Sequence, residues 1–99
     1  MKALLRNYEM VYIVKPDLEE EQVNEVVEKF SALISKDGGE VVAVDNWGKR
    51  RLAYEIKDFR EGNYFLVNFK GLPTTARELD RVLKISDEIL RFMIIRQEN

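Results

Sequence analysis

The chain has 99 residues, with 16 Lys and Arg against 18 Asp and Glu, and it contains neither cysteine nor histidine. That length is enough for one hydrophobic core but not for two, so we expect a single domain over residues 1–99. The lack of cysteine and histidine excludes disulfides, thiolate nucleophiles and every triad or metal site that needs an imidazole. No apolar run has the length of a signal peptide or of the roughly 20-residue membrane span, and we therefore predict a cytoplasmic protein.

The formal net charge of −2 hides an uneven distribution along the chain. Residues 17–40 hold eight acids and two lysines, a net charge of −6, whereas residues 47–60 hold five Lys and Arg and two acids, a net charge of +3. We expect an acidic helix, whose charged face we interpret as solvated surface, and a basic hairpin. A polyanion responds to such a local field more than to the total charge, although the overall basicity usual in nucleic-acid-binding domains is missing.

The first third of the chain predicts a strand and a helix. Residues 7–14 are rich in Tyr, Val and Ile, which favours a strand, and Pro16 ends it because proline lacks the ladder donor. Both faces of this strand are largely apolar, which indicates an interior position. Asp17 and Glu20 form a candidate capping box for the helix, which ends at Gly38-Gly39. Its buried stripe, at helical spacing, is Val23, Val26, Val27, Phe30 and Ile34.

The remaining elements complete an alternating order. A second strand begins at residues 40–44 and continues to residue 56, with a bend or bulge near residues 46–48. A turn over residues 57–63 leads to a third strand at residues 64–69, which pairs antiparallel with the second. Its core face is formed by Phe65, Val67 and Phe69.

A second helix and a fourth strand follow. Leu72-Pro73-Thr74-Thr75 opens the helix, with Thr75 and Glu78 as a candidate capping box. The buried stripe of this helix is Ala76, Leu79 and Leu83. The fourth strand spans residues 89–96, with Leu90, Phe92 and Ile94 on one side. The order predicts an α+β, ferredoxin-like βαββαβ fold: a four-stranded antiparallel sheet with two helices on one face, and the first and third strands in the middle.

The most distinctive segment is residues 47–57, where three adjacent cations run into alternating apolar positions. Side chains alternate along a strand, so one side of this segment packs and the other meets solvent or a polyanion. The expected packing side is Leu52, Tyr54 and Ile56, with Tyr54 as a buried core aromatic. Arg50 falls on that side as well. A bulge at Gly48 would re-aim Arg50, and otherwise its stem lies along the core edge with the guanidinium reaching outward.

The sheet face opposite the helices remains uncovered in this fold, and we expect it to be rich in apolar side chains. It is interpreted either as scattered surface hydrophobes or as a surface for a protein partner. The candidate partner-binding residues are Glu9, Val11, Ile13, Tyr64, Leu66, Met93 and Ile95. Tyr64 is the single aromatic residue placed on this face, which is weak support for base stacking.

The cations are better candidates for RNA binding than the sheet face. They are Lys49, Arg50, Arg51 and Lys57 on the basic segment, with Lys84 and Arg91 extending the patch around the sheet edge. Five phosphate contacts would give a log-log salt slope of about −3.5 to −4.5.

The same segment carries a resemblance to a known family. Read as Gly, any residue, a cation, a polar residue, Leu, Ala, Tyr, any residue, Ile, Lys, residues 48–57 match at all ten positions the signature of the bacterial small-subunit ribosomal protein S-six family. Trp47, Tyr8-Glu9 and Lys15-Pro16-Asp17-Leu18 are similar to the same family, so the resemblance covers nearly the whole chain. It implies a structural constituent of the ribosome that binds the central domain of small-subunit (16S-type) rRNA during assembly. It also implies pairing with ribosomal protein S-eighteen, for which the uncovered face is the candidate surface.

Two other functions are compatible with the fold. An acylphosphatase-like enzyme would use residue types that are supplied by Arg50, Arg51, Asn46 and Asn63. However, no glycine-rich phosphate cradle lies next to a helix N-terminus. A regulatory ligand-binding domain that dimerises through its sheet is the other alternative. Because fold alone does not confer activity, we predict a protein that is not an enzyme and has no cofactor.

Overall fold

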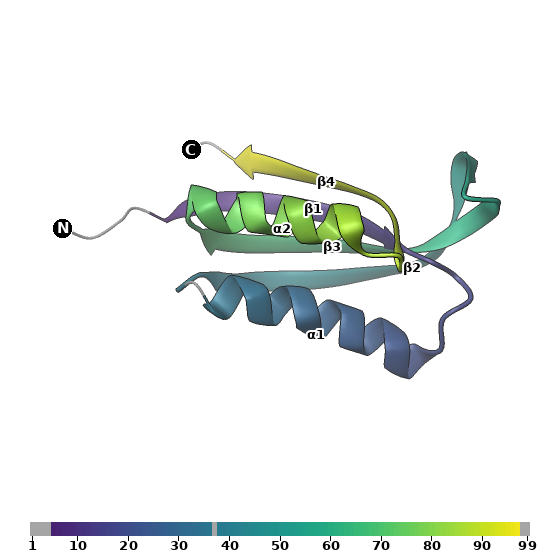
Figure 1. Cartoon of the computed structure of the whole chain (residues 1–99), viewed down its shortest axis with the longest axis horizontal. Coiled ribbons are helices and arrows are strands. Elements are labelled where there is room, and N and C mark those ends of the chain that lie inside the picture. The colour runs from purple at the N-terminus through teal and green to yellow at the C-terminus, as the bar shows by residue number, and fades with distance from the viewer. Residues whose placement is uncertain (1–4, 37, 98–99) are drawn as a thin grey trace.

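The computed structural model describes residues 5–36 and 38–97 (Figure 1). Strands and helices follow in the predicted order, and they are β1 (Arg6–Val14), α1 (Glu20–Lys36), β2 (Glu40–Ile56), β3 (Phe59–Gly71), α2 (Pro73–Ile85) and β4 (Ile89–Gln97). Neither helix in these residues combines the length and the apolar character needed to cross a membrane.

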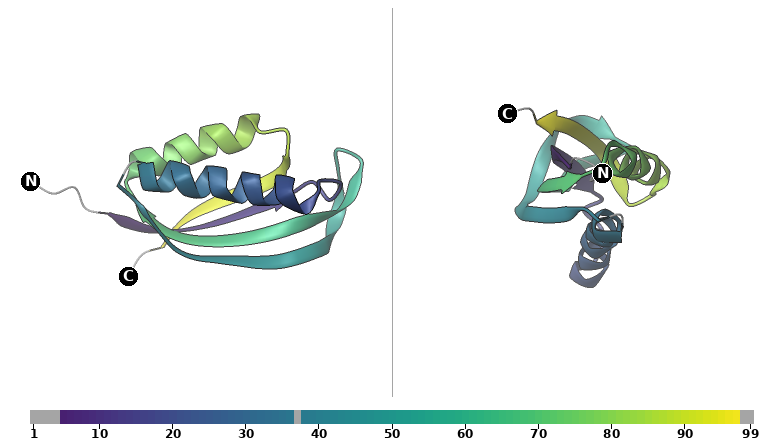
Figure 2. Two further views of the ribbon diagram at one scale, coloured as in Figure 1. Left: turned by 90° about the horizontal axis from the view of Figure 1, so that it is seen from below. Right: turned by 90° about the vertical axis from the view of Figure 1, so that its left-hand side faces the viewer.

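The four strands form one antiparallel sheet in the order β2-β3-β1-β4, so β1 and β3 lie in the middle, as predicted. Both helices lie on the same side of the sheet, as Figure 2 shows. The ferredoxin-like α+β prediction is therefore confirmed. The sheet has two faces of different character. One is covered by α1 and α2, and the other, called the open face below, carries no helix from the described part of the chain (Figure 2).

The main core lies between the sheet and the helices. Tyr12 at its centre is 0% exposed, and its ring lies 5.3 Å from that of Phe30 and 5.4 Å from that of Phe65. Most of the predicted core positions of β3 and of both helices are buried there, namely Phe65, Val67, Phe69, Val26, Phe30, Ile34, Leu79 and Leu83. The other predicted positions, Val23, Val27 and Ala76, are partly buried against this core. Helical and strand periodicity therefore located this core.

The start of α1 differs from the prediction. The helix begins at Glu20, and the backbone carbonyl of Glu19 accepts from the N–H of Val23 at 3.0 Å, which makes Glu19 the N-cap. The side chain of Gln22 accepts from the N–H of Glu19 at 3.0 Å. The expected capping box at Asp17 and Glu20 is therefore wrong by two residues, because Gln22 supplies the return bond that was assigned to Glu20.

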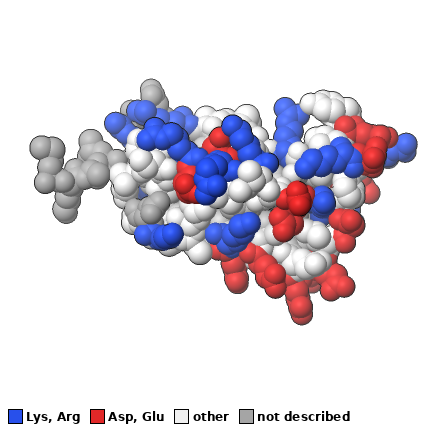
Figure 3. All heavy atoms as spheres, viewed as in Figure 1, with Lys and Arg blue, Asp and Glu red and all other residues white. Residues whose placement is uncertain are grey.

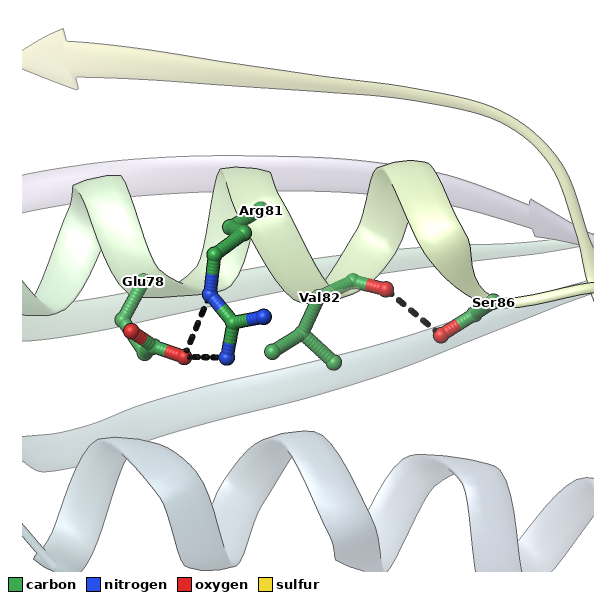
Figure 4. Close-up of polar contacts among 4 residues, drawn as sticks. All are labelled: Glu78, Arg81, Val82 and Ser86. Carbon is green, nitrogen blue, oxygen red and sulfur yellow. Dashed lines mark hydrogen bonds and ion pairs between the residues drawn. The ribbon is translucent and has the colours of Figure 1, made fainter.

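The start of α2 also differs. Leu72 is the N-cap, with extended backbone and no side-chain cap, and Pro73 occupies the first turn. Thr75 is inside the helix and fully buried, so its predicted capping role is wrong. Glu78 instead accepts from Arg81 one turn later, a contact that lowers the pKa of its carboxyl, while the Ser86 hydroxyl donates to the Val82 carbonyl at 2.7 Å (Figure 4).

The β2–β3 hairpin is longer than predicted. The turn consists of Lys57 and Asp58 alone, and β3 begins at Phe59 rather than at residue 64. Both turn residues have positive φ, 52° and 69°, as in the type I′ turn that suits a twisted hairpin. Because β1 ends opposite Asn63, the hairpin continues beyond the rest of the sheet and curls away from it (Figure 1).

Candidate functional site

The basic segment lies on β2, one of the two edge strands of the sheet. Lys49, Arg50 and Arg51 are paired with Asn63, Gly62 and Glu61 of β3, and all three cations are exposed. The predicted bulge is present just before them: the register shifts between Asn46 and Gly48, and Gly48 has a φ of 78°. The Asn46 side chain accepts from the Gly48 N–H at 2.8 Å, which satisfies a backbone donor at the bulge.

Arg50, whose direction the sequence left open, lies on the exposed surface. Its Nε donates to the Trp47 carbonyl at 3.3 Å, and its guanidinium carbon lies 5.7 Å from the centre of the Trp47 ring. A cation at this distance from an indole is attracted by the ring face. The bulge therefore folds Arg50 back over Trp47, which limits the positions of the guanidinium.

The packing side of the basic segment was only partly predicted. Leu52 is 7% exposed and packs with Ile13 and Leu90, whereas Tyr54 is 62% exposed. The expectation that Tyr54 is a buried core aromatic is therefore wrong. Its hydroxyl accepts from Arg91 Nη1 at 2.7 Å, a contact between residues far apart in sequence that no local pattern indicates.

The remaining candidate cations lie at a different place. Lys57, Lys84 and Arg91 line one hollow of about 270 Å³ between the hairpin turn, the end of α2 and the start of β4. Lys84 also pairs with Asp80 one turn earlier, at 3.0 Å. The six predicted RNA-binding residues thus fall into two groups, which we call the β2 strip (Lys49, Arg50, Arg51) and the turn hollow (Lys57, Lys84, Arg91).

The seven candidate partner-binding residues share the open face. The registers place them in three rows across β3, β1 and β4, namely Tyr64-Ile13-Arg91, Leu66-Val11-Met93 and Asn68-Glu9-Ile95. Met93 and Ile95 are the most open apolar members, 53% and 42% exposed. Ile13 shares the face but is only 6% exposed, so it is a packing residue rather than a contact surface.

A shallow hollow of about 310 Å³ marks the first two rows of this face. It is lined by Val11, Ile13, Tyr64, Arg91, Phe92 and Met93. Arg91 therefore lies between the open face and the turn hollow.

Leu90 departs from the predicted alternation. It was assigned to the same side as Phe92 and Ile94, which pack on the main core, but it packs with Ile13 and Leu52 instead. The register of β4 against β1 shifts at this point, between Ile13 and Val14. A bulge shifts the side-chain alternation, so strict period-2 counting fails there.

The charge distribution agrees with the expected acidic helix. In Figure 3 the Asp and Glu side chains gather along the lower edge at α1, where some Lys or Arg side chains also lie, and further Lys and Arg lie over α2 and the upper edge. The projecting hairpin carries both positive and negative side chains (Figure 3). Two of them, Arg60 and Glu55, form an ion pair at 3.0 Å. The β2 strip is the part of the hairpin where cations are consecutive in sequence.

Comparison with known proteins identifies the family. The family model for ribosomal protein S6 matches residues 7–96. The chain belongs to the ribosomal protein S6 family. Small ribosomal subunit protein bS6 of Moorella thermoacetica is 56% identical over 94 residues, covering 95% of this chain and 96% of that protein. The corresponding protein of Heliobacterium modesticaldum is also 56% identical, with 95% and 98% covered.

A solved structure supports the same assignment. The crystal structure of 30S ribosomal protein S6 from Thermotoga maritima superposes with a TM-score of 0.88 at 32% identity, covering 94% of this chain and 88% of that one. Membership makes this chain a structural protein of the small ribosomal subunit, located on the cytoplasmic ribosome, rather than an enzyme. The acylphosphatase-like alternative is therefore not retained.

Proposed function

We propose that this S6-family chain acts as a single RNA-binding domain over residues 1–99 that binds small-subunit (16S-type) rRNA together with ribosomal protein S-eighteen. The observation that carries the RNA part is the β2 strip: three consecutive exposed cations on an edge strand. Within the described residues, none of the three has a carboxylate within salt-bridge distance. Their charges are therefore available to RNA phosphates.

The geometry of the β2 strip suits backbone recognition. The bulge at Gly48 and the contact of Arg50 with Trp47 limit the positions that the guanidinium can take, which lowers the entropy lost on binding. Phosphate contacts of this kind set affinity and orientation without reading bases. We therefore expect binding that depends strongly on salt.

The open face supports the partner part of the proposal. Its apolar side chains, rimmed by Glu9 and Arg91, form a patch of the kind that marks protein contacts in soluble proteins. Met93 and Ile95 lie on the edge strand β4 and are its most accessible apolar members.

The RNA proposal is tested by replacing Lys49, Arg50 and Arg51 with Ala and titrating a transcript of the 16S central domain across a salt series. We expect the slope of log affinity against log salt to flatten by about 2.1–2.7, since each of the three lost phosphate contacts removes roughly 0.7–0.9. The melting temperature should stay within about 3 °C, because the three side chains are exposed. An unchanged slope would remove the β2 strip from the interface.

A matched variant controls for total charge. Lys29, Lys36 and Arg77 are three exposed cations on the helices, away from the hairpin. Replacing them with Ala removes the same formal charge, and we expect a flattening of less than about half that of the β2-strip variant because distant charges are screened.

The partner proposal has its own test. Met93→Asp places a charge in the open-face hollow, and we expect binding to ribosomal protein S-eighteen to weaken by at least about tenfold because that charge would be desolvated. Ile85→Asp is the control, since Ile85 is 68% exposed on α2, on the helix side. Equal losses in both variants would show that the open face is not the binding surface.

A further inference from the structure

The hairpin turn contains a departure from ordinary turn chemistry. Lys57 and Asp58 both have positive φ, 52° and 69°, in a two-residue turn where Asn-Gly is the usual sequence. A residue with a Cβ in this region of φ and ψ is strained, and glycine or asparagine would remove much of that strain. Backbone strain that persists in a fold is concentrated at functional positions.

Lys57, the first residue of this strained turn, shares a hollow with two other cations. Lys57 lines the turn hollow with Lys84 and Arg91, and the rest of the wall is apolar. Lys84 forms an ion pair with Asp80. Arg91 has no carboxylate within salt-bridge distance in the described residues. The hollow therefore has an excess of positive charge.

Arg91 is held in place at the edge of this hollow. One of its guanidinium N–H groups donates to the Tyr54 hydroxyl at 2.7 Å, and its guanidinium carbon lies 6.0 Å from the Tyr54 ring centre. The hydroxyl is a neutral acceptor, so it orients the guanidinium without cancelling its charge. Tyr54 and Lys57 come from the hairpin, whereas Arg91 comes from β4, so the site forms only when the hairpin lies against that end of the domain.

We propose that the turn hollow is a second RNA-binding subsite, which takes one phosphodiester group of the RNA backbone between Lys57, Lys84 and Arg91. This inference rests on the proposed RNA-binding function and adds to it, because it separates the turn hollow from the β2 strip. The strained conformation of Lys57 is retained because it directs a cation into the hollow. Tyr54 acts as a positioning residue that orients Arg91.

The strain allows a test in which stability and affinity change in opposite directions. In Lys57→Asn the turn gains a residue suited to positive φ, so the melting temperature should stay unchanged or rise by up to about 5 °C. Affinity for the 16S central-domain transcript should fall about tenfold, with the salt slope flatter by roughly 0.7–0.9, since one charged contact is lost. Wild-type affinity in Lys57→Asn would overturn the subsite.

Two control variants separate the charge from the turn. Asp58→Gly relieves strain in the same turn and keeps Lys57, so we expect a higher melting temperature with RNA affinity equal to or tighter than wild type. Lys70→Gln removes a cation at the opposite end of β3, paired with Glu40 and Asn7, and should change affinity less than about threefold. If Asp58→Gly weakens RNA binding as much as Lys57→Asn, the shape of the turn matters and the cation does not, which would refute the proposal.

Removing the charge of single RNA phosphates, instead of charges on the protein, tests whether a phosphodiester group occupies the turn hollow. A set of transcripts, each with one backbone phosphate replaced by a neutral methylphosphonate, should include one that binds wild type about tenfold more weakly but loses nothing further with Lys57→Asn. The proposal is refuted if, for every methylphosphonate position, Lys57→Asn weakens binding by the same factor as it does with the unmodified transcript. In that case no phosphodiester occupies the hollow. Failure of wild type to bind the unmodified transcript, even with ribosomal protein S-eighteen present, would instead overturn the proposed function itself, so the two failures are distinguishable.

Discussion

The hydroxyl of Tyr12 is a polar group buried in the main core. The side chain is 0% exposed, and the hydroxyl has no hydrogen-bond partner among the described residues. A buried hydroxyl without a partner costs roughly 1–3 kcal/mol. Tyr12→Phe removes the hydroxyl and keeps the ring contacts with Phe30 and Phe65. We expect the free energy of unfolding to rise by about 1–2 kcal/mol at pH 7, and the melting temperature by roughly 5–10 °C.

The burial of Tyr12 also makes the free energy of unfolding depend on pH. Desolvation raises the pKa of Tyr12 well above its ordinary value. Above about pH 10 the unfolded chain loses this proton while the folded chain keeps it, so the unfolded state binds fewer protons and stability falls by up to about 1.4 kcal/mol per pH unit. Below about pH 10 both states are protonated and this contribution is absent. The stability difference between Tyr12→Phe and wild type should therefore widen between about pH 10 and 11.5.

Urea denaturation followed by far-UV circular dichroism measures both effects. Tyr8→Phe is the control, since Tyr8 lies four residues earlier on the same face of β1 but its hydroxyl is not a fully buried atom without a partner. It should change stability by less than about 0.5 kcal/mol. A Tyr12→Phe variant that is less stable than wild type by 1 kcal/mol or more would mean that the hydroxyl makes a hydrogen bond in solution. Parallel pH profiles would mean that Tyr12 titrates as if exposed.

Two further predictions concern the seating of the hairpin. Leu52→Ala should cost about 2–3 kcal/mol, because Leu52 is 7% exposed, whereas Tyr54→Ala should cost less than about 1 kcal/mol, because Tyr54 is 62% exposed. Urea midpoints compare them, and the reverse order would mean that Tyr54 seats the strand. Gly62→Ala should cost roughly 1–3 kcal/mol, because its new methyl group would overlap the branched Cγ2 of Ile13, which is itself buried. Thermal unfolding measures this loss, and a neutral Gly62→Ala would show that Ile13 can move aside.

The sheet and both helices could be predicted because their signals repeat. In α1 the stripe that contains Val26, Phe30 and Ile34 recurs at helical spacing, and in β3 the alternation of Phe65, Val67 and Phe69 recurs at strand spacing. Each repeated position adds to the same conclusion, so one ambiguous residue does not change it. The antiparallel order with β1 and β3 central then follows from the handedness of the crossovers.

The helix caps were missed because several residues offer the same chemistry. Residues 17–22 contain one Asp, three Glu and one Gln, so the sequence allows more than one pair at the capping-box spacing. The pair that forms is Glu19 and Gln22, at a helix that begins at Glu20. Thr75 was predicted as a cap because of its hydroxyl, but it lies inside α2, fully buried next to Gly71 of β3.

The hairpin was the hardest part to predict, for a physical reason. Strand alternation tells which side chains share a side, but burial on that side depends on what lies opposite, and β1 ends at Val14, opposite Asn63. Beyond that point the hairpin has no third strand beside it. Leu52 is buried because it packs with Ile13 and Leu90, whereas Tyr54 stays 62% exposed and accepts a hydrogen bond from Arg91. A segment released from the sheet in this way keeps its polar and charged side chains accessible, which is the condition that binding to RNA requires.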